Sequence, residues 1–279
     1  MLSFTAERRV RDGLIFPENP RWREGMLYFS DIFDGTIWAI AENGAGGQIA
    51  KLEAGPSGLG FLPDGDLLAV SMQESRLLRW RNQTFRLHAD LAHLAPYGLN
   101  DMAVDRAGRA YVVQLASDSM DPAPMLIVEP DGSARLHDEP LHVGNGICLT
   151  SDGRRLIVAE SAGCQLSLFD VAANGTVSAR RILSLPDGHY PDGICLDEEG
   201  GIWAACLWHG VIRITEDGSV THRVSLPGKL NAYACMLGGS DRCTLFICAA
   251  QSHLRDSACD SRSGAILAME MDCEGAGVD

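Results

Sequence analysis

The chain has 279 residues, of which 46% are hydrophobic and 22% are charged, and its formal net charge is −14. This composition is typical of a globular protein, and the excess of acidic residues argues against DNA or RNA as a partner and favours a small molecule or a cation. No run of 18 apolar residues is present and the first nine residues lack an apolar signal stretch, so neither a membrane span nor secretion is expected. The nine cysteines include no CxxC pair. We interpret them as reduced thiols of a cytoplasmic protein, rather than as a disulfide framework.

Along the chain, a turn containing glycine recurs six times, and a short apolar run follows each turn. The turns are centred on Gly25, Gly65, Gly108, Gly153, Gly200 and Asp241, the last of these following Gly239. Successive turns lie 40, 43, 45, 47 and 41 residues apart. This period is typical of one four-stranded propeller blade, and the sequence therefore predicts an all-β, six-bladed propeller as a single domain over residues 1–279. An open solenoid of the same period is the structural alternative.

The fourth unit illustrates how each blade is read. Residues 146–150 and 156–160 form continuous apolar runs, residues 165–170 alternate, and Asn174-Gly175 predicts a hairpin before residues 177–185. The sixth unit has only two clear strands after its turn, at 242–250 and 264–272. We expect the N-terminal segment from about Thr5 to Ile15 to supply an outer strand of that blade and to close the ring.

Polar residues recur at one position before these turns, where the innermost strand of each blade begins. Glu18 precedes Gly25 by seven residues, and the residues eight before the next four turns are Ser57, Asn100, Asn145 and Asp192. In the last unit this position falls near Tyr233 or Ala234. The side chains should point into the central channel, where two carboxylates and two amides would favour a hard divalent cation. The alternative is that Asn and Asp occur there only because they suit turns.

Four segments that contain these residues resemble the family of regucalcin (senescence marker protein), gluconolactonase and luciferin-regenerating enzyme. They are FPENPRW at 16–22, GLND at 98–101, NGIC at 145–148 and PDGICLD at 191–197. The resemblance implies a six-bladed propeller with one divalent metal and lactone hydrolysis. It assigns the metal to Glu18, Asn145 and Asp192, with Asp192 also the general base. Asn100 matches a residue that contacts substrate or a metal-bound water, and Asp101 is a neighbouring group that we count with it as substrate-binding.

The chain departs from the family pattern in two places that affect the substrate. Gly98 stands where sugar lactonases from animals carry a substrate-binding arginine, and residues 203–209 (WAACLWH) are bulkier than a hydroxyl-rich ligand requires. A less polar lactone or another ester-like substrate is therefore an alternative to a sugar lactone. His209 and Trp208 could line the pocket or simply pack. His189 could reach the channel mouth or lie in a surface loop.

We therefore expect a metal-dependent lactonase that acts on a small molecule and is a monomer or a small homo-oligomer. Ca²⁺ is the expected cofactor, and Mg²⁺, Mn²⁺, Zn²⁺ and Fe²⁺ are alternatives. No HxH or HExxH spacing indicates a zinc–histidine site. Three other functions stay open: a different reaction on the same metal site (phosphotriester hydrolysis, or an isomerase or lyase step), a non-catalytic calcium-binding propeller, and a metal-free propeller similar to strictosidine synthase.

Overall fold

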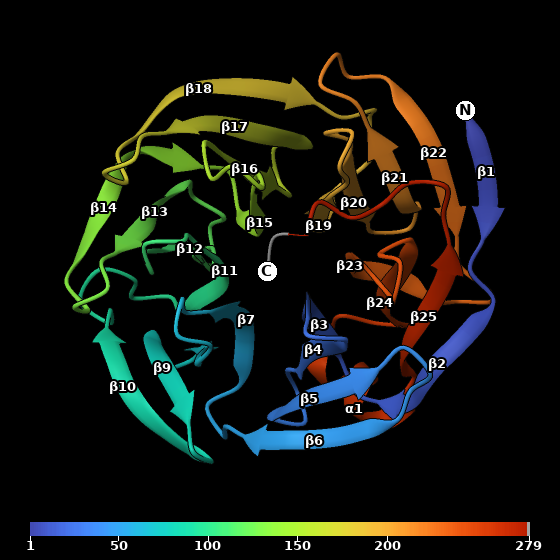
Figure 1. The fold of residues 1–279 in the computed structure, drawn as a ribbon, viewed down its shortest axis with the longest axis horizontal. Coiled ribbons are helices and arrows are strands. Elements are labelled where there is room, and N and C mark those ends of the chain that lie inside the picture. The colour runs from blue at the N-terminus through green and yellow to red at the C-terminus, as the bar shows by residue number, and fades with distance from the viewer. Residues whose placement is uncertain (278–279) are drawn as a thin grey trace.

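The computed structural model of the protein describes residues 1–277, so the expected domain of residues 1–279 extends two residues beyond it. Six sheets of four or five strands stand in a ring around one axis, as Figure 1 shows. In each sheet the innermost strand comes first in the chain and the next three follow outward, except that the last strand of the sixth sheet comes from the N-terminus. The predicted six-bladed propeller is confirmed.

Blade 1 consists of β3 (Pro17–Arg23), β4 (Met26–Asp31), β5 (Thr36–Ala41) and β6 (Gly46–Lys51). Blade 2 consists of β7 (Pro56–Phe61), β8 (Leu67–Ser71), β9 (Arg76–Arg81) and β10 (Thr84–Asp90). Blade 3 consists of β11 (Leu99–Val104), β12 (Ala110–Gln114), β13 (Ala123–Val128) and β14 (Ala134–Leu141). Blade 4 consists of β15 (Gly144–Leu149), β16 (Arg155–Glu160), β17 (Gln165–Val171) and β18 (Val177–Ser184). Blade 5 contains β19 (Pro191–Leu196), β20 (Ile202–Cys206), β21 (Gly210–Ile214) and β22 (Val220–Ser225). Blade 6 consists of β23 (Asn231–Gly238), β24 (Thr244–Ala250), β25 (Gly264–Glu270) and β2 (Arg8–Leu14).

The N-terminal segment closes the ring as predicted. Strand β2 runs antiparallel to β25, with Arg8 opposite Ala268 and Leu14 opposite Gly264, so blade 6 is completed by residues from the other end of the chain. The preceding strand β1 (Leu2–Thr5) was not predicted. It adds a fifth, parallel strand to blade 5 along β22. A mostly exposed segment of four residues carries too little hydrophobic pattern to predict such pairing.

The core lies between neighbouring blades, where apolar side chains of their inner strands interlock. Every residue of β8, β12 and β20 is buried, whereas the outermost strands of blades 1 to 4 are mostly exposed. Trp203 and Tyr111 are among the largest fully buried side chains. Continuous apolar inner strands are what burial on both faces requires. The nine cysteines are free thiols.

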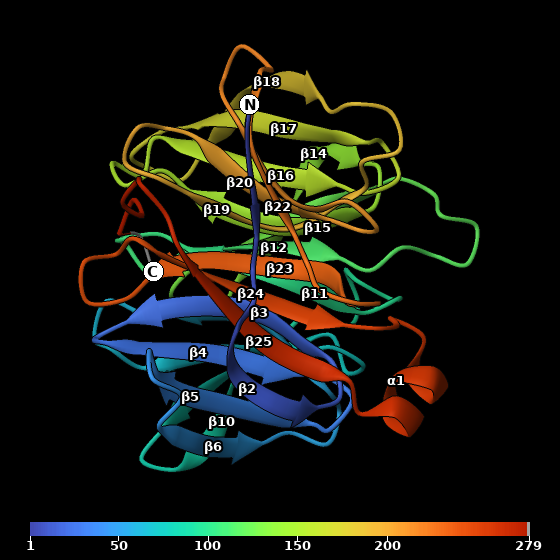
Figure 2. The same cartoon turned by 90° about the vertical axis from the view of Figure 1, so that its right-hand side faces the viewer.

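The loops on one face of the ring are the longer ones. They include the connection between β12 and β13 and the segment between β24 and β25, which contains the helix α1 (Arg255–Ser261). Figure 2 shows α1 and the β12–β13 connection projecting on the same side of the ring. Within residues 1–277, no helix has the length and apolar character needed to span a membrane.

Candidate metal and substrate site

The recurring polar position is the second residue of the innermost strands of blades 1 to 5, at the face that carries the longer loops. In blade 6 it is the third residue, Tyr233, because Ala232 lies opposite Ala249 as Pro191 lies opposite Cys206 in blade 5. We call these six positions the axial ring: Glu18 in β3, Ser57 in β7, Asn100 in β11, Asn145 in β15, Asp192 in β19 and Tyr233 in β23. The sixth member is one of the two residues that the sequence placed there.

A β-bulge follows the start of each innermost strand. In blade 5, for example, Pro191 lies opposite Cys206 and Ile194 opposite Ala204, so β19 has one more residue than β20 over this stretch. The innermost strands of the other five blades show the same kind of register shift. Bulges bend a strand and redirect side chains. The extra residue explains how the axial ring can face the axis while the rest of the strand packs between blades.

The bulges also bring neighbouring innermost strands into close contact, which explains the glycines after three members of the axial ring. A Cβ on Gly146 would lie 2.4 Å from the carbonyl oxygen of Asp192, and one on Gly193 would lie 2.3 Å from the Cβ of Ala234. Gly58 is equally confined, because a Cβ on it would lie 2.7 Å from the backbone nitrogen of Met102. In the motifs NG at 145–146 and DG at 192–193, a residue of the axial ring is therefore followed by a residue that must be small.

Hydrogen bonds connect the polar side chains of the axial ring from blade to blade. Asn100 Nδ2 donates to Asn145 Oδ1 at 3.0 Å, and Ser57 Oγ lies 3.4 Å from Asn100 Oδ1. Asn145 Nδ2 donates to Ser161 Oγ at 3.2 Å. These hydrogen bonds fix which atom of the Asn145 amide is the oxygen and direct that oxygen toward Asn100.

Glu18 is buried, Asp192 is half-buried, and their negative charges repel each other. Burial raises the pKa of Glu18 well above its usual value, and the charge of Asp192 raises it further. Burial likewise raises the pKa of Asp192 to about 8, the charge of Asp101 adds to the effect, and hydrogen bonds from Asn145 and the Gly193 backbone oppose it. The structure thus brings together the carboxylates and amides that the sequence predicted to meet.

Asp101 lies one residue past the axial ring and is fully engaged by the protein. It is 2% exposed, and its Oδ1 accepts hydrogen bonds from Arg21 Nη2 at 2.6 Å and from the Met102 backbone at 2.8 Å. Its Oδ2 accepts from the Ile147 backbone at 3.3 Å. These contacts occupy the carboxylate that we had grouped with Asn100 for binding substrate, and they suit a positioning role better than direct contact.

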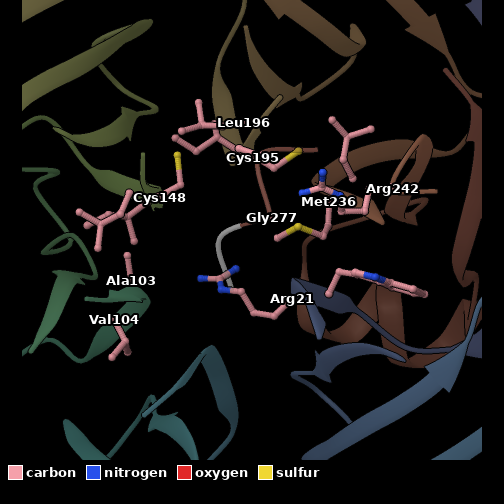
Figure 3. Close-up of a pocket in the computed structure, with 15 residues that line it drawn as sticks. Arg21, Ala103, Val104, Cys148, Cys195, Leu196, Met236, Arg242 and Gly277 are labelled. Atoms are coloured by element: carbon pink, nitrogen blue, oxygen red, sulfur yellow. The ribbon is translucent and has the colours of Figure 1, made fainter. Parts of the chain in front are cut away.

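Arg21 was not singled out in the sequence, yet it crosses the ring from blade 1 to blade 3. Besides the ion pair with Asp101, its Nη2 donates to the Met102 carbonyl at 2.6 Å. Figure 3 shows its guanidinium in the middle of the ring, opposite Cys148. The cavity that it lines together with Cys148, Cys195 and Met236 measures only about 50 Å³, which is too small for a substrate. A ligand therefore has to approach from the axial ring.

The net negative charge around the axial ring favours binding of a divalent cation. Glu18, Asp101 and Asp192 interact electrostatically, and Arg21 is the cation that lowers the pKa of both Glu18 and Asp101. When all three carboxylates are ionised, the one guanidinium leaves two negative charges uncompensated. Within residues 1–277 no cluster of three or more His, Cys, Asp or Glu side chains could hold a metal. A site here must combine two carboxylates with amide oxygen, a donor set suited to hard cations.

Tyr233, the blade 6 member of the axial ring, supplies a polar group whose role the sequence analysis had not assigned. Its ring is 2% exposed and packs edge-on against Phe16, with ring centroids 4.7 Å apart. Burial and then the charges of Asp192 and Glu18 raise the pKa of the Tyr233 hydroxyl. It lies near the Asn231 side chain, but no group of the described chain meets hydrogen-bond geometry with it. An unpaired buried hydroxyl beside two acids is suited to a ligand oxygen.

Gly98 leaves no space for the side chain that sugar lactonases were expected to carry there. Its φ is +106°, and a Cβ would lie 2.8 Å from the carbonyl oxygen of Met72 and 2.9 Å from Leu115 Cδ1. The backbone itself therefore excludes an arginine at this position. Any polar contact to the distant part of a substrate has to come from elsewhere on this face.

Comparisons with known proteins agree with this architecture. Residues 16–251 match the family model described as the SMP-30/Gluconolactonase/LRE-like region. Regucalcin of Xenopus laevis is 27% identical over 90% of this chain and 88% of that protein, and pentonolactonase XacC of Haloferax volcanii is 27% identical over 87% and 84%. Regucalcin of Danio rerio is 29% identical, but the alignment covers 61% of this chain and 60% of that protein.

Solved structures share the fold at lower identity. The structure described as a calcium-binding protein, regucalcin, from Agrobacterium tumefaciens has a TM-score of 0.83 at 20% identity and covers 99% of this chain and 97% of its own. The gluconolactonase XC5397 of Xanthomonas campestris has a TM-score of 0.74 at 20% identity, covering 94% and 88%.

Proposed function

Because the chain belongs to the SMP-30/gluconolactonase/LRE-like family, we propose that it is a lactonase that depends on a divalent cation. One observation carries the proposal: two acids from blades 1 and 5, the buried Glu18 and the half-buried Asp192, interact next to the oriented amide of Asn145. Glu18, Asn145 and Asp192 would hold the cation. Ca²⁺ is favoured by an all-oxygen donor set, and the Agrobacterium relative is described as calcium-binding.

The cation, when bound, would polarise the lactone carbonyl and make a nearby water more acidic. Asp192 would accept a proton from the attacking water, which adds to the carbonyl carbon. Asn100 Nδ2 and the Tyr233 hydroxyl would donate hydrogen bonds to the oxygen atoms that gain negative charge. When the ring C–O bond breaks, the proton held by Asp192 passes to the departing alkoxide, and the product is the open hydroxy acid.

The Arg21–Asp101 ion pair has a supporting part in this scheme. It stands beneath the axial ring, and Asp101 is hydrogen-bonded to the backbone of blades 3 and 4 next to Asn100 and Asn145. The pair therefore holds these two strands in position and adds a fixed charge below the acids. We assign Asp101 this positioning role and leave direct contact with substrate to Asn100.

Lactone hydrolysis by chelated and metal-restored protein tests the proposal. Protein stripped with EDTA should lose turnover of a panel of sugar and aliphatic lactones, and Ca²⁺, Mg²⁺, Mn²⁺ or Zn²⁺ added singly should restore it. Phosphotriesters in the same assay separate the lactonase from another hydrolase on this site. Equal turnover before and after chelation, or turnover of phosphotriesters alone, would contradict the proposal.

A calcium-binding protein without catalysis is the second candidate, because the Agrobacterium relative is described by its calcium binding. Such a protein would retain the cation and hydrolyse none of the substrates. The partner-free hydroxyl of Tyr233 and the half-buried Asn100 favour the enzyme, since a pure cation site needs neither.

A further inference from the structure

A second cavity opens beside the axial ring, on the same face. Its volume is about 380 Å³, and Trp208, His209, Arg223, Lys229 and Asn231 are among the residues that line it. These residues come from the β20–β21 turn, the end of β22, the β22–β23 loop and the first residue of β23. Asn231 lies two residues before Tyr233 of the axial ring, so the cavity adjoins the metal and substrate site between blades 5 and 6.

Two cations in this cavity lack an acidic partner. Arg223 and Lys229 form no ion pair with any carboxylate of residues 1–277, although the chain carries a net charge of −14. Other partly buried arginines do pair with acids: Arg213 lies 2.6 Å from Asp197, and Arg180 lies 2.6 Å from Glu160. Acidic side chains are therefore abundant in the chain, but none of them lines this cavity.

A pair of stacked histidines orients Arg223 without neutralising it. His189 is 6% exposed, and its Nδ1 lies 3.1 Å from the Pro186 carbonyl, to which it must donate a proton. Its Nε2 is then an acceptor, and it lies 3.3 Å from Arg223 Nη2. His209 stacks on this ring with centroids 4.0 Å apart. The guanidinium thus has a fixed position and keeps its full charge.

Trp208 forms the aromatic wall of the cavity, and its conformation is unusual. Its side chain is 66% exposed, and its φ of +67° is costly for a bulky residue. Tyr190 packs edge-on against it with centroids 5.9 Å apart and is itself 40% exposed. Neither burial nor turn geometry explains two exposed aromatic rings next to two unpaired cations, whereas a ligand would.

The cavity and the proposed catalytic acid are electrostatic neighbours. Cys206 at the end of β20 lies opposite Pro191, the residue before Asp192, on one side and opposite Gly210, which lines the cavity, on the other. Burial and the charge of Asp192 together raise the pKa of its thiol to about 12, and Arg223 opposes them. One small molecule could place its reacting group at Asp192 and a second group at Arg223.

We propose that this cavity binds an anionic group of the substrate, a carboxylate or a phosphate, through Arg223 and Lys229, while Trp208 packs against its carbon skeleton. The inference rests on the proposed function and makes it more specific: the substrate is a lactone with an acidic substituent away from its carbonyl. It also accounts for the absence of an arginine at position 98, because the polar contact with the substrate comes from blade 5 and the β22–β23 loop instead.

A matched substrate series tests this inference. Glucono-1,5-lactone and its 6-phosphate form one pair, and glucono-1,4-lactone and glucaro-1,4-lactone form a second pair. Within each pair the ring is the same, and the hydroxymethyl group is replaced by a group with a phosphate or a carboxylate. We expect the wild-type protein to prefer an anionic member, and the double variant Arg223→Gln, Lys229→Gln to reduce the anionic-to-neutral ratio of kcat/KM roughly 10- to 100-fold. The control Arg86→Gln, Lys51→Gln removes the same charge from exposed positions of β10 and β6 and should leave the ratio unchanged.

A binding measurement separates failure of this inference from failure of the lactonase assignment. With EDTA present, succinate or inorganic phosphate should produce a saturable change in tryptophan fluorescence that is lost in Trp208→Phe and in the Arg223, Lys229 double variant. This result supports the site even if no lactone is hydrolysed. If both proteins hydrolyse neutral and anionic lactones equally well, the proposal of an anionic subsite is wrong but the lactonase assignment stands. If neither anion changes the fluorescence, the proposal of an anionic subsite is also wrong.

Discussion

The carboxylates of Glu18 and Asp192 come from innermost strands of different blades, yet the charge of Asp192 raises the pKa of Glu18. Glu18 is 6% exposed, and burial alone disfavours its ionised form. Folding therefore brings together two acids that would be more stable apart unless a cation or protons compensate them. Each of the following predictions depends on this arrangement or on the contacts that support it.

The stability of the metal-free protein should decrease as the pH rises. The pKa values of Glu18 and Asp192 are raised in the folded state, so the folded protein binds more protons than the unfolded chain between the ordinary carboxyl pKa and about 8 for Asp192. Over that window each pH unit lowers the free energy of unfolding. Tm measured in EDTA should fall from about pH 5 to about pH 8, and Ca²⁺ should raise it most at the high end. A Tm that rises over this range would contradict the account.

Glu18→Gln should stabilise the metal-free protein while weakening cation binding. The substitution removes one of two repelling acids and keeps the shape of the side chain. We expect a higher Tm in EDTA at pH 8 than for the wild type, and a smaller increase in Tm on adding Ca²⁺. Glu24→Gln, which changes an exposed glutamate in the nearby turn, is the matched control and should behave like the wild type.

Asp192→Asn should abolish most turnover, because the proposed base and one charged ligand are lost together. Base catalysis contributes roughly 10²–10⁴-fold, so kcat should fall at least that far. Hydrolysis followed by pH-stat at saturating metal is the appropriate measurement. Near wild-type kcat with normal metal content would show that Asp192 does not serve as the base.

Tyr233→Phe should reduce the rate without destabilising the protein. The hydroxyl lacks a hydrogen-bond partner in the described chain, so its removal leaves nothing unpaired and should keep or slightly raise Tm. If the hydroxyl donates to the reacting oxygen, kcat should fall roughly 10- to 100-fold with little change in KM. An unchanged kcat would exclude Tyr233 from the reaction.

Arg21→Met should be strongly destabilising, because it leaves the buried Asp101 carboxylate without its cation. Breaking a buried pair from one side typically costs about 3–5 kcal/mol. The double variant Arg21→Met, Asp101→Leu should recover much of this loss in urea unfolding, since neither charge remains. If the single variant is as stable as the wild type, the ion pair does not support the axial ring.

The sequence predicted the ring because its period of 40 to 47 residues and its turn glycines are local features. Gly65 and Gly153, for example, adopt left-handed φ values of +89° and +69° in the turns where they were expected. The closing strand β2 was predicted from the incomplete last unit. In contrast, β1 is too short to carry a pattern, and its parallel partner β22 lies far along the chain.

The site was only partly predictable, because its details depend on the bulges. The repeat identified the position of Glu18, Ser57, Asn100, Asn145 and Asp192, and it placed the sixth member near Tyr233 or Ala234 without deciding between them. Side-chain direction after a bulge does not follow strand alternation. The Arg21–Asp101 pair therefore gave no signal in the sequence, although the two residues meet across the ring. Likewise, only the fold brings His189, His209 and Arg223 together.

Calorimetric titration of the EDTA-stripped and desalted protein with Ca²⁺ at about pH 8 tests the central claim most directly, because every later step assumes a cation at Glu18 and Asp192. We predict one site per chain in the wild type, with affinity reduced at least roughly 10-fold in Glu18→Gln and in Asp192→Asn. Absence of binding for Ca²⁺ and for Mg²⁺, Mn²⁺ and Zn²⁺ titrated in the same way, or binding of wild-type affinity in both variants, would contradict the account.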